Sequence, residues 1–327
     1  MLNYRPKMFD EASKSHASKK LIWIILSFIV VFFVILILET IVPGIISWGA
    51  MKEEMARLSA AGFSGSEWEL SMKASQIVSA EPNIMVPTLL STVFGTLAAI
   101  FYCRCIELRP VRSMGAVKKH SLLNYAVGMV IGAVLMTSIV LMSKLTGTSR
   151  MTLCENINYK VLCLFFLGFF VQGMSEEFIF RGYFMTTIGG AGHHTALAVG
   201  ISAVGFALAH ATNPGFGPIP FINLTLFGVF AALYMILTDS IWGVSAIHSI
   251  WNFTQGDLYG ISVSGSADTE SVWRTTAVSA KDYLTGGEFG IEGSLFTTIA
   301  LGIGTVAVLF LLSRKAAAAK TAPEAAA

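Results

Sequence analysis

The sequence predicts an all-α, polytopic membrane protein with a bundle of about eight transmembrane helices. Of its 327 residues, 54% are hydrophobic and 13% are charged, and the mean hydropathy is +0.68. A soluble domain has about 25% charged residues, because its surface must stay polar. The net charge of +2 is too small to indicate nucleic-acid binding. These values exclude a soluble enzyme, a nucleic-acid-binding protein and a disordered chain.

Each predicted span is an apolar run near the length of about 20 residues with which a helix crosses the hydrocarbon core. The eight runs are Leu21–Ile46, Ile84–Cys103, Leu122–Met142, Asn158–Arg181, Ala196–His210, Pro218–Leu237, Ile241–Gly256 and Gly293–Leu312. An even number of spans places both termini on the same side of the membrane.

The spans predict six segments along the chain. They are an N-terminal segment (1–20), three spans with an acidic outer loop (21–150), a core of four spans (155–256), an outer loop (257–292), the last span (293–313) and an Ala-rich, disordered tail (314–327). Within the first outer loop, residues 51–80 are expected to form a solvated loop helix, because apolar residues recur there at helical spacing.

The distribution of Lys and Arg predicts the orientation. Residues 1–20 and 104–119 each contain five basic residues, and residues 314–320 contain three. In contrast, residues 48–83 contain five Glu against three basic residues, and residues 257–292 contain six acids against two. Cytoplasmic loops carry the excess of Lys and Arg. We therefore expect a multi-pass protein of the cell membrane with both termini in the cytoplasm.

Ionisable residues are rare in the core of four spans. Such residues are costly in a bilayer unless they are paired or hydrated, so they usually line a functional cavity. Residues 161–273 contain one basic residue, Arg181, and residues 156–256 contain three acids, Glu176, Glu177 and Asp239. Two histidines, His210 and His248, also lie within apolar runs. The chemistry of the protein is expected among these few side chains.

Helical spacing assigns different roles to the two adjacent glutamates. Glu177 and Arg181 are four residues apart with the acid first, which is the favourable order for an ion pair on one helix face. Glu176 is turned by about 100° from Glu177, so it is less well placed for neutralisation by the arginine. We expect Glu177 to be paired and Glu176 to be free to handle protons. A purely structural ion pair is equally consistent with the Glu177–Arg181 spacing.

The same spacing occurs in the other two spans. His248 and Asn252 are four residues apart and present two hydrogen-bonding groups from adjacent turns, and Phe206 shares a helix face with His210. Taken alone, His210 is as well explained by packing against a backbone carbonyl as by catalysis.

Depth along the helices imposes one further expectation. Glu176 and His210 lie at comparable distances from the Gly-rich turn at 189–192, but His248 lies closer to that membrane face. The three residues meet if Gly182–Ala196 lies along the cytoplasmic interface and does not continue the helix. Asn213–Pro218, which contains two prolines and two glycines, is expected to be non-helical and to line a wet cavity.

Over residues 155–256, the chain resembles the CPBP family of intramembrane proteases, which includes CAAX prenyl endopeptidases and bacteriocin-processing or self-immunity proteins. The family pattern is Glu-Glu followed after three residues by Arg, then Phe and His four apart, then His and Asn or Asp four apart. Its residues here are Glu176, Glu177, Arg181, Phe206, His210, His248 and Asn252.

The resemblance implies an endopeptidase that depends on a glutamate. Glu176 and His210 would activate a water, and His248 and Asn252 would stabilise the oxyanion. Glu177, Arg181 and Phe206 would support these groups. No cofactor is expected. The alternative is zinc bound by Glu176, His210 and His248, although the sequence has no His-Glu-x-x-His motif.

The expected partners are the lipid bilayer and a membrane-associated peptide or protein, such as a prenylated CAAX-type tail or a leader peptide, and no nucleic acid. Two other functions are consistent with the sequence. The first is a catalytically silent immunity or scaffold protein of the same fold. The second is a proton-coupled transporter, which would require inverted repeats that the sequence does not show.

Overall fold

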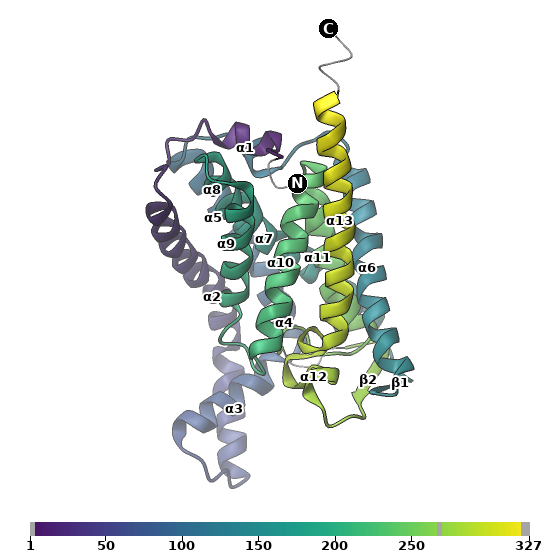
Figure 1. Ribbon diagram of the computed structural model, residues 1–327. Helices are drawn as coiled ribbons and strands as arrows, with labels where there is room; N and C mark the ends of the chain where they lie inside the picture. The colour runs from purple at the N-terminus through teal and green to yellow at the C-terminus, as the bar shows by residue number, and fades with distance from the viewer. Residues whose placement is uncertain (1–3, 267–269, 322–327) are drawn as a thin grey trace.

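The structure is a computed structural model that describes residues 4–266 and 270–321. It is a helical bundle, as predicted, with one short sheet at one end (Figure 1). Its helices are α1 (Lys7–Ala12), α2 (Leu21–Ala60), α3 (Glu67–Ser79), α4 (Pro82–Ser91), α5 (Val93–Phe101), α6 (Ser121–Leu145), α7 (Tyr159–Glu177), α8 (Thr186–Gly190), α9 (Thr195–Ala209), α10 (Pro218–Thr238), α11 (Ile241–Phe253), α12 (Asp282–Thr285) and α13 (Leu295–Thr321). Short π-helical turns follow α5, α7 and α11, and short 3-10 turns lie at 111–114, 287–289 and 291–293.

Six helices in the described part of the chain are long and apolar enough to cross a membrane. They cover Leu21–Ala60, Pro82–Ile106, Ser121–Leu145, Tyr159–Gly190, Pro218–Thr238 and Leu295–Ala318. The prediction of a helical, polytopic membrane protein is therefore confirmed. The other two predicted spans form helices that are shorter than a full crossing, since α9 has 15 residues and α11 has 13.

Three features differ from the sequence-based expectations. Helix α2 continues to Ala60, past the expected end of its span at Ile46, and α3 folds back against it. Helix α13 continues to Thr321, so residues 314–321 of the tail are helical and not disordered, because their Ala-rich sequence favours helix. The rest of the tail lies outside the described residues. Strands β1 (Ser149–Leu153) and β2 (Trp273–Ala277) form an antiparallel pair that was not predicted.

The prediction that the helix does not continue into Gly182–Ala196 is wrong. The helix that begins at Tyr159 continues through a π-helical stretch, Phe178–Met185, and through α8 to Gly190. Every residue from Phe178 to Gly190 is buried, so this stretch has no polar face to present to an interface. Gly189 and Gly190 let α1 pack directly on it, because a Cβ at either position would collide with Phe9 or Ala12. In contrast, the segment Asn213–Pro218 is non-helical up to Gly217, as expected, while Pro218 is the first residue of α10.

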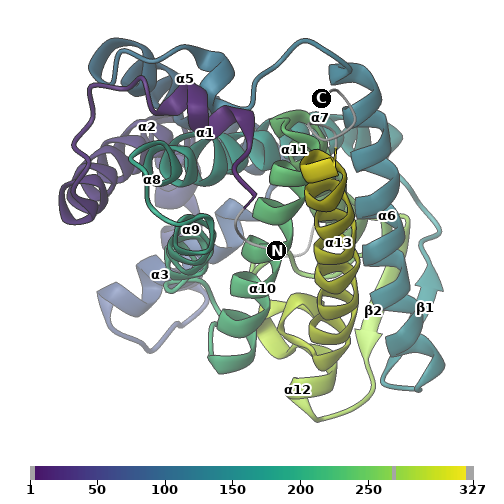
Figure 2. The same ribbon diagram turned by 45° about the horizontal axis from the view of Figure 1, so that its top comes forward.

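Helix α11 lies at the centre of the bundle and packs against α6, α7 and α10 (Figure 2). Glycines on two neighbouring helices let its backbone approach closely. A Cβ at Gly132 of α6 would lie 2.5 Å from the carbonyl oxygen of Ile247, and one at Gly173 of α7 would lie 2.6 Å from the backbone nitrogen of Ser249. Small residues at helix contacts are typical of membrane bundles. These contacts fix the depth and rotation of His248, which lies between the two contacted residues.

Different helices, strands and turns lie at the two ends of the bundle (Figure 1). We call the end that carries α1, α8 and the turn between α10 and α11 the termini end. The other end, which carries β1, β2, α12 and the turn at 211–217, is called the opposite end.

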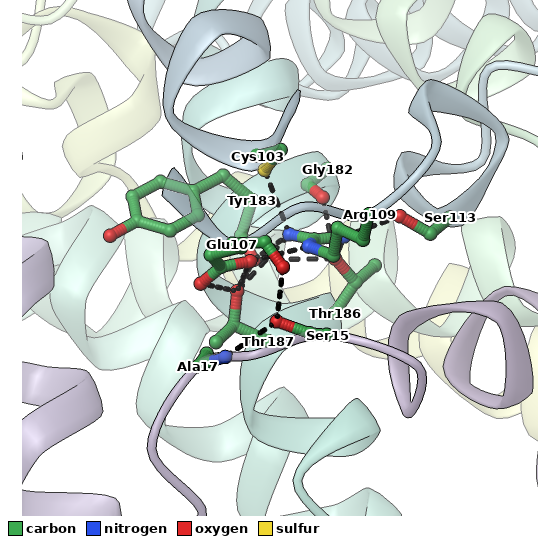
Figure 3. Close-up of polar contacts among 10 residues, drawn as sticks. All are labelled: Ser15, Ala17, Cys103, Glu107, Arg109, Ser113, Gly182, Tyr183, Thr186 and Thr187. Atoms are coloured by element: carbon green, nitrogen blue, oxygen red, sulfur yellow. Dashed lines mark hydrogen bonds and ion pairs between the residues drawn. The ribbon is translucent and has the colours of Figure 1, made fainter. Parts of the chain in front are cut away.

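A fully buried polar cluster lies at the termini end (Figure 3). Arg109 is 0% exposed, its Nε donates to Glu107, and its other donors reach side chains of Ser113, Thr186 and Thr187. The place of Arg109 in the basic segment 104–119 suggests an exposed loop residue, but its side chain is buried. It joins that segment to the end of the long helix that contains α7.

Candidate active site

The expected ion pair is present at the centre of the bundle, between the last residue of α7 and the π-helical stretch that follows it. Arg181 Nη1 donates to Glu177 Oε1 at 2.9 Å, and both side chains are 0% exposed. The Arg181 guanidinium also lies 4.4 Å from the centre of the Phe206 ring on α9, at a distance that favours a cation–π interaction. The pair and the ring together connect α7 to α9.

Glu177 also binds His248, which the sequence did not predict. The Nδ1 of His248 lies 2.9 Å from Glu177 Oε1, the same oxygen that accepts from Arg181. Because a carboxylate only accepts, Nδ1 carries the proton of this bond and Nε2 points away from Glu177. Nε2 of His248 lies 3.7 Å from Glu176 Oε2. Glu177 thus fixes the orientation of the histidine ring directly.

His210 is held in a similar way by the backbone. It caps the C-terminus of α9, and its Nδ1 lies 2.9 Å from the carbonyl oxygen of Phe206. The carbonyl can only accept, so Nδ1 is the donor and Nε2 faces the interior. This Nε2 lies 4.0 Å from Glu176 Oε2. The two interpretations of His210 are therefore compatible. Its Nδ1 packs against a backbone carbonyl, and its Nε2 is available for catalysis.

Glu176 is the point at which these groups converge. Its Oε1 accepts a hydrogen bond from Gln172 Nε2, one helical turn earlier on α7. Its Oε2 faces the Nε2 atoms of both histidines, is buried, and accepts no hydrogen bond within the described part of the chain. Since the side chain of Glu176 keeps 23% of its area exposed, the carboxylate borders a space that can hold water.

Gln172 is a further residue of the site and lies outside the family pattern. Its Oε1 accepts from Asn252 Nδ2 at 2.8 Å, while its Nε2 donates to Glu176. Gln172 therefore connects the fourth expected site residue, Asn252 on α11, to Glu176 on α7. The i, i+4 spacing of Gln172 and Glu176 is the sequence signal that could have identified it.

These four expected residues border one cavity. It has a volume of about 130 Å³ and is lined by Glu176, His210, His248 and Asn252, together with apolar side chains such as Phe227. A single water needs only about 10–15 Å³ by this measure. The cavity can therefore hold several waters in contact with a carboxylate and two imidazoles.

Glu39 of α2 is a third carboxylate near the site that lies in a candidate membrane span, after Glu176 and Glu177. A Cβ at Gly95 would lie 2.4 Å from Glu39 Oε1 and 2.8 Å from Ser175 Oγ. The Glu39 carboxylate therefore occupies the space that the glycine leaves beside Ser175, the residue before Glu176. The sequence could have identified Glu39, because it is the only acid in the apolar run 21–46. It lies outside the three motifs, which are all in the second half of the chain.

Glu292 is a further cavity-lining acid that no motif indicated. It lies in the predicted outer loop, yet it is 7% exposed. Trp251 Nε1 donates to its Oε1 at 3.0 Å, and the backbone N–H and hydroxyl of Ser264 donate to its Oε2 at 2.8 and 2.7 Å. Glu292 therefore holds the 262–266 loop against the cavity.

The zinc alternative does not match the geometry of the described residues. Ligands of a tetrahedral zinc ion with bonds of about 2.0–2.2 Å lie about 3.3–3.6 Å apart. The two Glu176–histidine distances, 4.0 and 3.7 Å, are wider. No group of three or more His, Cys, Asp or Glu side chains in residues 4–266 and 270–321 has the geometry to hold a metal ion.

We expect Gln172→Leu to lower kcat without changing KM, and to lower the thermal stability as well, because Gln172 bonds both Glu176 and Asn252 in the resting structure. The substitution removes a donor to a carboxylate, which is worth about 1.5–3 kcal/mol and corresponds to roughly a ten- to hundredfold lower rate. Peptide hydrolysis by the purified variant and its thermal unfolding in detergent measure the two effects separately. A variant with unchanged kcat would show that Gln172 does not position Glu176.

One comparison with known proteins gives a match. Residues 158–254 match the model of the Rce1-like family, described as type II CAAX prenyl endopeptidase Rce1-like. The matched segment begins at the residue that caps α7 and ends just after α11, so it contains all seven residues of the expected pattern. This match confirms the resemblance noted in the sequence. Comparisons with curated proteins and with solved structures give no match.

Proposed function

We propose, from the similarity of residues 158–254 to type II CAAX prenyl endopeptidases, that the protein is an intramembrane endopeptidase. The observation that carries the proposal is the convergence of Glu176 Oε2 and the Nε2 atoms of His210 and His248, from three helices, on one cavity. Its substrate would be a peptide bond in a membrane-associated peptide or protein.

Glu176 and His210 would activate the attacking water. A water beside Glu176 Oε2 gives one proton to the carboxylate as it attacks, while its other hydrogen is held by the unprotonated Nε2 of His210. The Nδ1–H of His210 is bound to the Phe206 carbonyl, so the neutral ring presents an acceptor at this position. The new C–O bond forms as the carbonyl electrons move onto the carbonyl oxygen.

His248 and Asn252 would stabilise the oxyanion. Asn252 uses one Nδ2 hydrogen for Gln172 and keeps a second hydrogen for the oxyanion. His248 already donates through Nδ1 to Glu177, so its Nε2 donates only when the ring is an imidazolium. The Glu177 carboxylate at 2.9 Å stabilises that cation. Each donor of this kind typically contributes about 2.7–4 kcal/mol to transition-state stabilisation.

Collapse of the tetrahedral intermediate completes the reaction. The C–N bond breaks, and Glu176 returns the proton that it took from the water to the departing amine. The products are a carboxylic acid and an amine, the acid passes its proton to the amine to give a carboxylate and an ammonium group, and Glu176 is again ionised. The reaction consumes one water, and the chain returns to its starting protonation state.

The test of the proposal compares peptides in membranes that contain wild-type protein or the Glu176→Gln variant. We expect a set of fragments to disappear in the variant, because an amide cannot accept the proton of the water. Mass spectrometry of peptides from matched membranes detects the change. The control is Glu53→Gln, the same substitution at an exposed residue of α2, which should leave the fragments in place.

Persistence of every fragment in Glu176→Gln, at equal membrane levels, would contradict the proposal. If the biological effect of the protein also persisted in that variant, the alternative of a catalytically silent scaffold or immunity protein would be supported.

We expect proteolysis to survive a strong chelator. In the proposed reaction, side chains alone activate the water and stabilise the oxyanion, so removal of divalent metals should leave the rate of the purified protein within about twofold. Loss of activity that zinc restores would contradict this expectation and would favour the ligand set Glu176, His210 and His248.

A further inference from the structure

The termini end gathers the three basic segments of the sequence. Arg112 of the 104–119 segment forms a 3.0 Å ion pair with Glu11 of α1. Lys315, in the tail after the last span, donates to the carbonyl oxygen of Leu237 at 2.7 Å and lies 5.1 Å from the centre of the Tyr4 ring. By the positive-inside rule, the end that carries these segments is cytoplasmic.

The catalytic cavity is bordered by loops of the opposite end. Asn213, Ser264 and Ser266 line it, and the same three residues line a larger neighbouring cavity of about 620 Å³. We call this larger cavity the vestibule. Its other lining residues include Gln76 and Ser79 of α3, and both of these are exposed. The vestibule therefore lies directly beside the catalytic cavity and reaches the surface at the opposite end.

The path from the site toward the termini end is filled by protein. Glu177 and Arg181 are fully buried directly beside Glu176, and the stretch from Phe178 to Gly190 that leads from them to the termini end is buried throughout. The Arg109 cluster then packs against the last turns of that stretch (Figure 3).

In the wall of the vestibule, the backbone of the 262–266 loop packs closely on the turn at 211–217. Gly265 has a φ of +83°, and a Cβ there would lie 2.4 Å from the carbonyl oxygen of Pro214. Gln255 Nε2 donates to the carbonyl oxygen of Ser262 at 2.6 Å, and Glu292 binds Ser264. These contacts hold the 262–266 loop in place at the opening of the vestibule.

The chemistry of the vestibule suits a polar peptide. Its lining is dominated by the amides, hydroxyls and glycine backbone of residues such as Gln76, Ser79, Asn213 and Ser262, with one acid, Glu288. Neutral hydrogen-bonding groups of this kind match the donors and acceptors of an extended backbone.

We propose that the catalytic cavity opens to the non-cytoplasmic side and that the substrate is a polar peptide segment presented from that side, at the outer boundary of the membrane. This inference rests on the proposed function, because the bound peptide is a substrate only if the protein is an endopeptidase. It excludes a cytoplasmic prenylated tail, because such a tail would have to cross the filled half of the bundle to reach Glu176.

Cysteine labelling tests the direction of the opening without any catalytic readout. The exposed or partly exposed Cys105, Cys154 and Cys163 are replaced by Ser, and the buried Cys103 is kept. Ser266→Cys then reports on the vestibule, and Lys19→Cys, also an exposed position, is the matched control at the termini end. A membrane-impermeant maleimide is added to sealed right-side-out or inside-out vesicles.

We expect Ser266→Cys to be labelled at least tenfold faster in right-side-out vesicles and Lys19→Cys at least tenfold faster in inside-out vesicles. The reverse pattern would overturn the proposal. Equal labelling of both positions in one type of vesicle would also overturn it, as would a Ser266→Cys thiol that stays unlabelled after permeabilisation.

Blocking the vestibule then tests the route of the substrate. Outside labelling of Ser266→Cys with a bulky impermeant maleimide should reduce the Glu176-dependent fragments at least tenfold relative to the same variant without label. Unchanged fragments after complete labelling would overturn the substrate side. Because fragments that persist in Glu176→Gln would instead refute proteolysis, the two failures are distinguishable.

Discussion

Arg181→Met is expected to lower the free energy of unfolding by about 3–5 kcal/mol, because it leaves the Glu177 carboxylate buried without its cation. Arg181 and Glu177 are both 0% exposed and are joined at 2.9 Å. The variant should also lose activity, since an uncompensated Glu177 would change the protonation and position of His248. Thermal unfolding of the detergent-solubilised protein and hydrolysis by the folded fraction give the two measurements.

The double variant Glu177→Gln/Arg181→Met separates charge from packing. It removes both buried charges, so most of the lost stability should return, because replacing a whole buried pair by similar-sized neutral groups costs far less than breaking it. Activity should stay low, since His248 has lost the carboxylate that stabilises its imidazolium. If Arg181→Met alone unfolded within 1 kcal/mol of wild type, the pair would not be a determinant of the fold.

The sequence could predict the Glu177–Arg181 pair because the pair depends on local helix geometry. The four-residue spacing of Glu177 and Arg181 places them on one face, and the structure confirms their ion pair. The same spacing places Phe206 and His210 together, and the backbone carbonyl of Phe206 accepts from the His210 ring. Contacts of this kind depend on one helix only, so they follow from residue order.

Contacts between helices could not be predicted in this way. The bond from His248 to Glu177 and the bridge of Gln172 to Asn252 depend on how α7 and α11 are rotated and how deep each lies. That register is set by the close approach at Gly173, which looks like any other glycine of an apolar span in sequence. The roles of Glu176, His210, His248 and Asn252 in catalysis stay predictions, to be tested by the variants above.

The error over Gly182–Ala196 has a related cause. The expected interfacial segment was introduced to bring His248 to the depth of Glu176 in straight, ideal helices. In the structure the helix passes through a π-helical stretch at Phe178–Met185, and π-helical turns change the direction and register of the residues that follow. The depth of a residue follows from its sequence position only where the rise per residue is constant, and this stretch does not have a constant rise.

Arg109→Met is expected to lower the free energy of unfolding by about 3–5 kcal/mol, because it breaks a buried charge pair with Glu107. The basic segment 104–119 gave no sign of this burial in the sequence. Arg109 is the donor at the centre of a cluster in which Glu107 is only 2% exposed (Figure 3). Its removal leaves the Glu107 carboxylate buried without a cation, and among the residues that the structure describes the one side-chain donor left to it is Thr187 at 3.0 Å. Thermal unfolding in detergent measures the loss.

Arg112→Met is the matched control for this prediction. Arg112 lies three residues further along the same segment and also pairs with a glutamate, Glu11, but its side chain is 60% exposed. Exposed pairs of this kind contribute about 0–1 kcal/mol, so the control should unfold close to wild type. Equal losses in the two variants would show that burial of the Arg109 cluster is not what stabilises the termini end. A larger loss in Arg109→Met, reversed in part by adding Glu107→Gln, would show that the buried charge pair anchors the helix that carries Glu176.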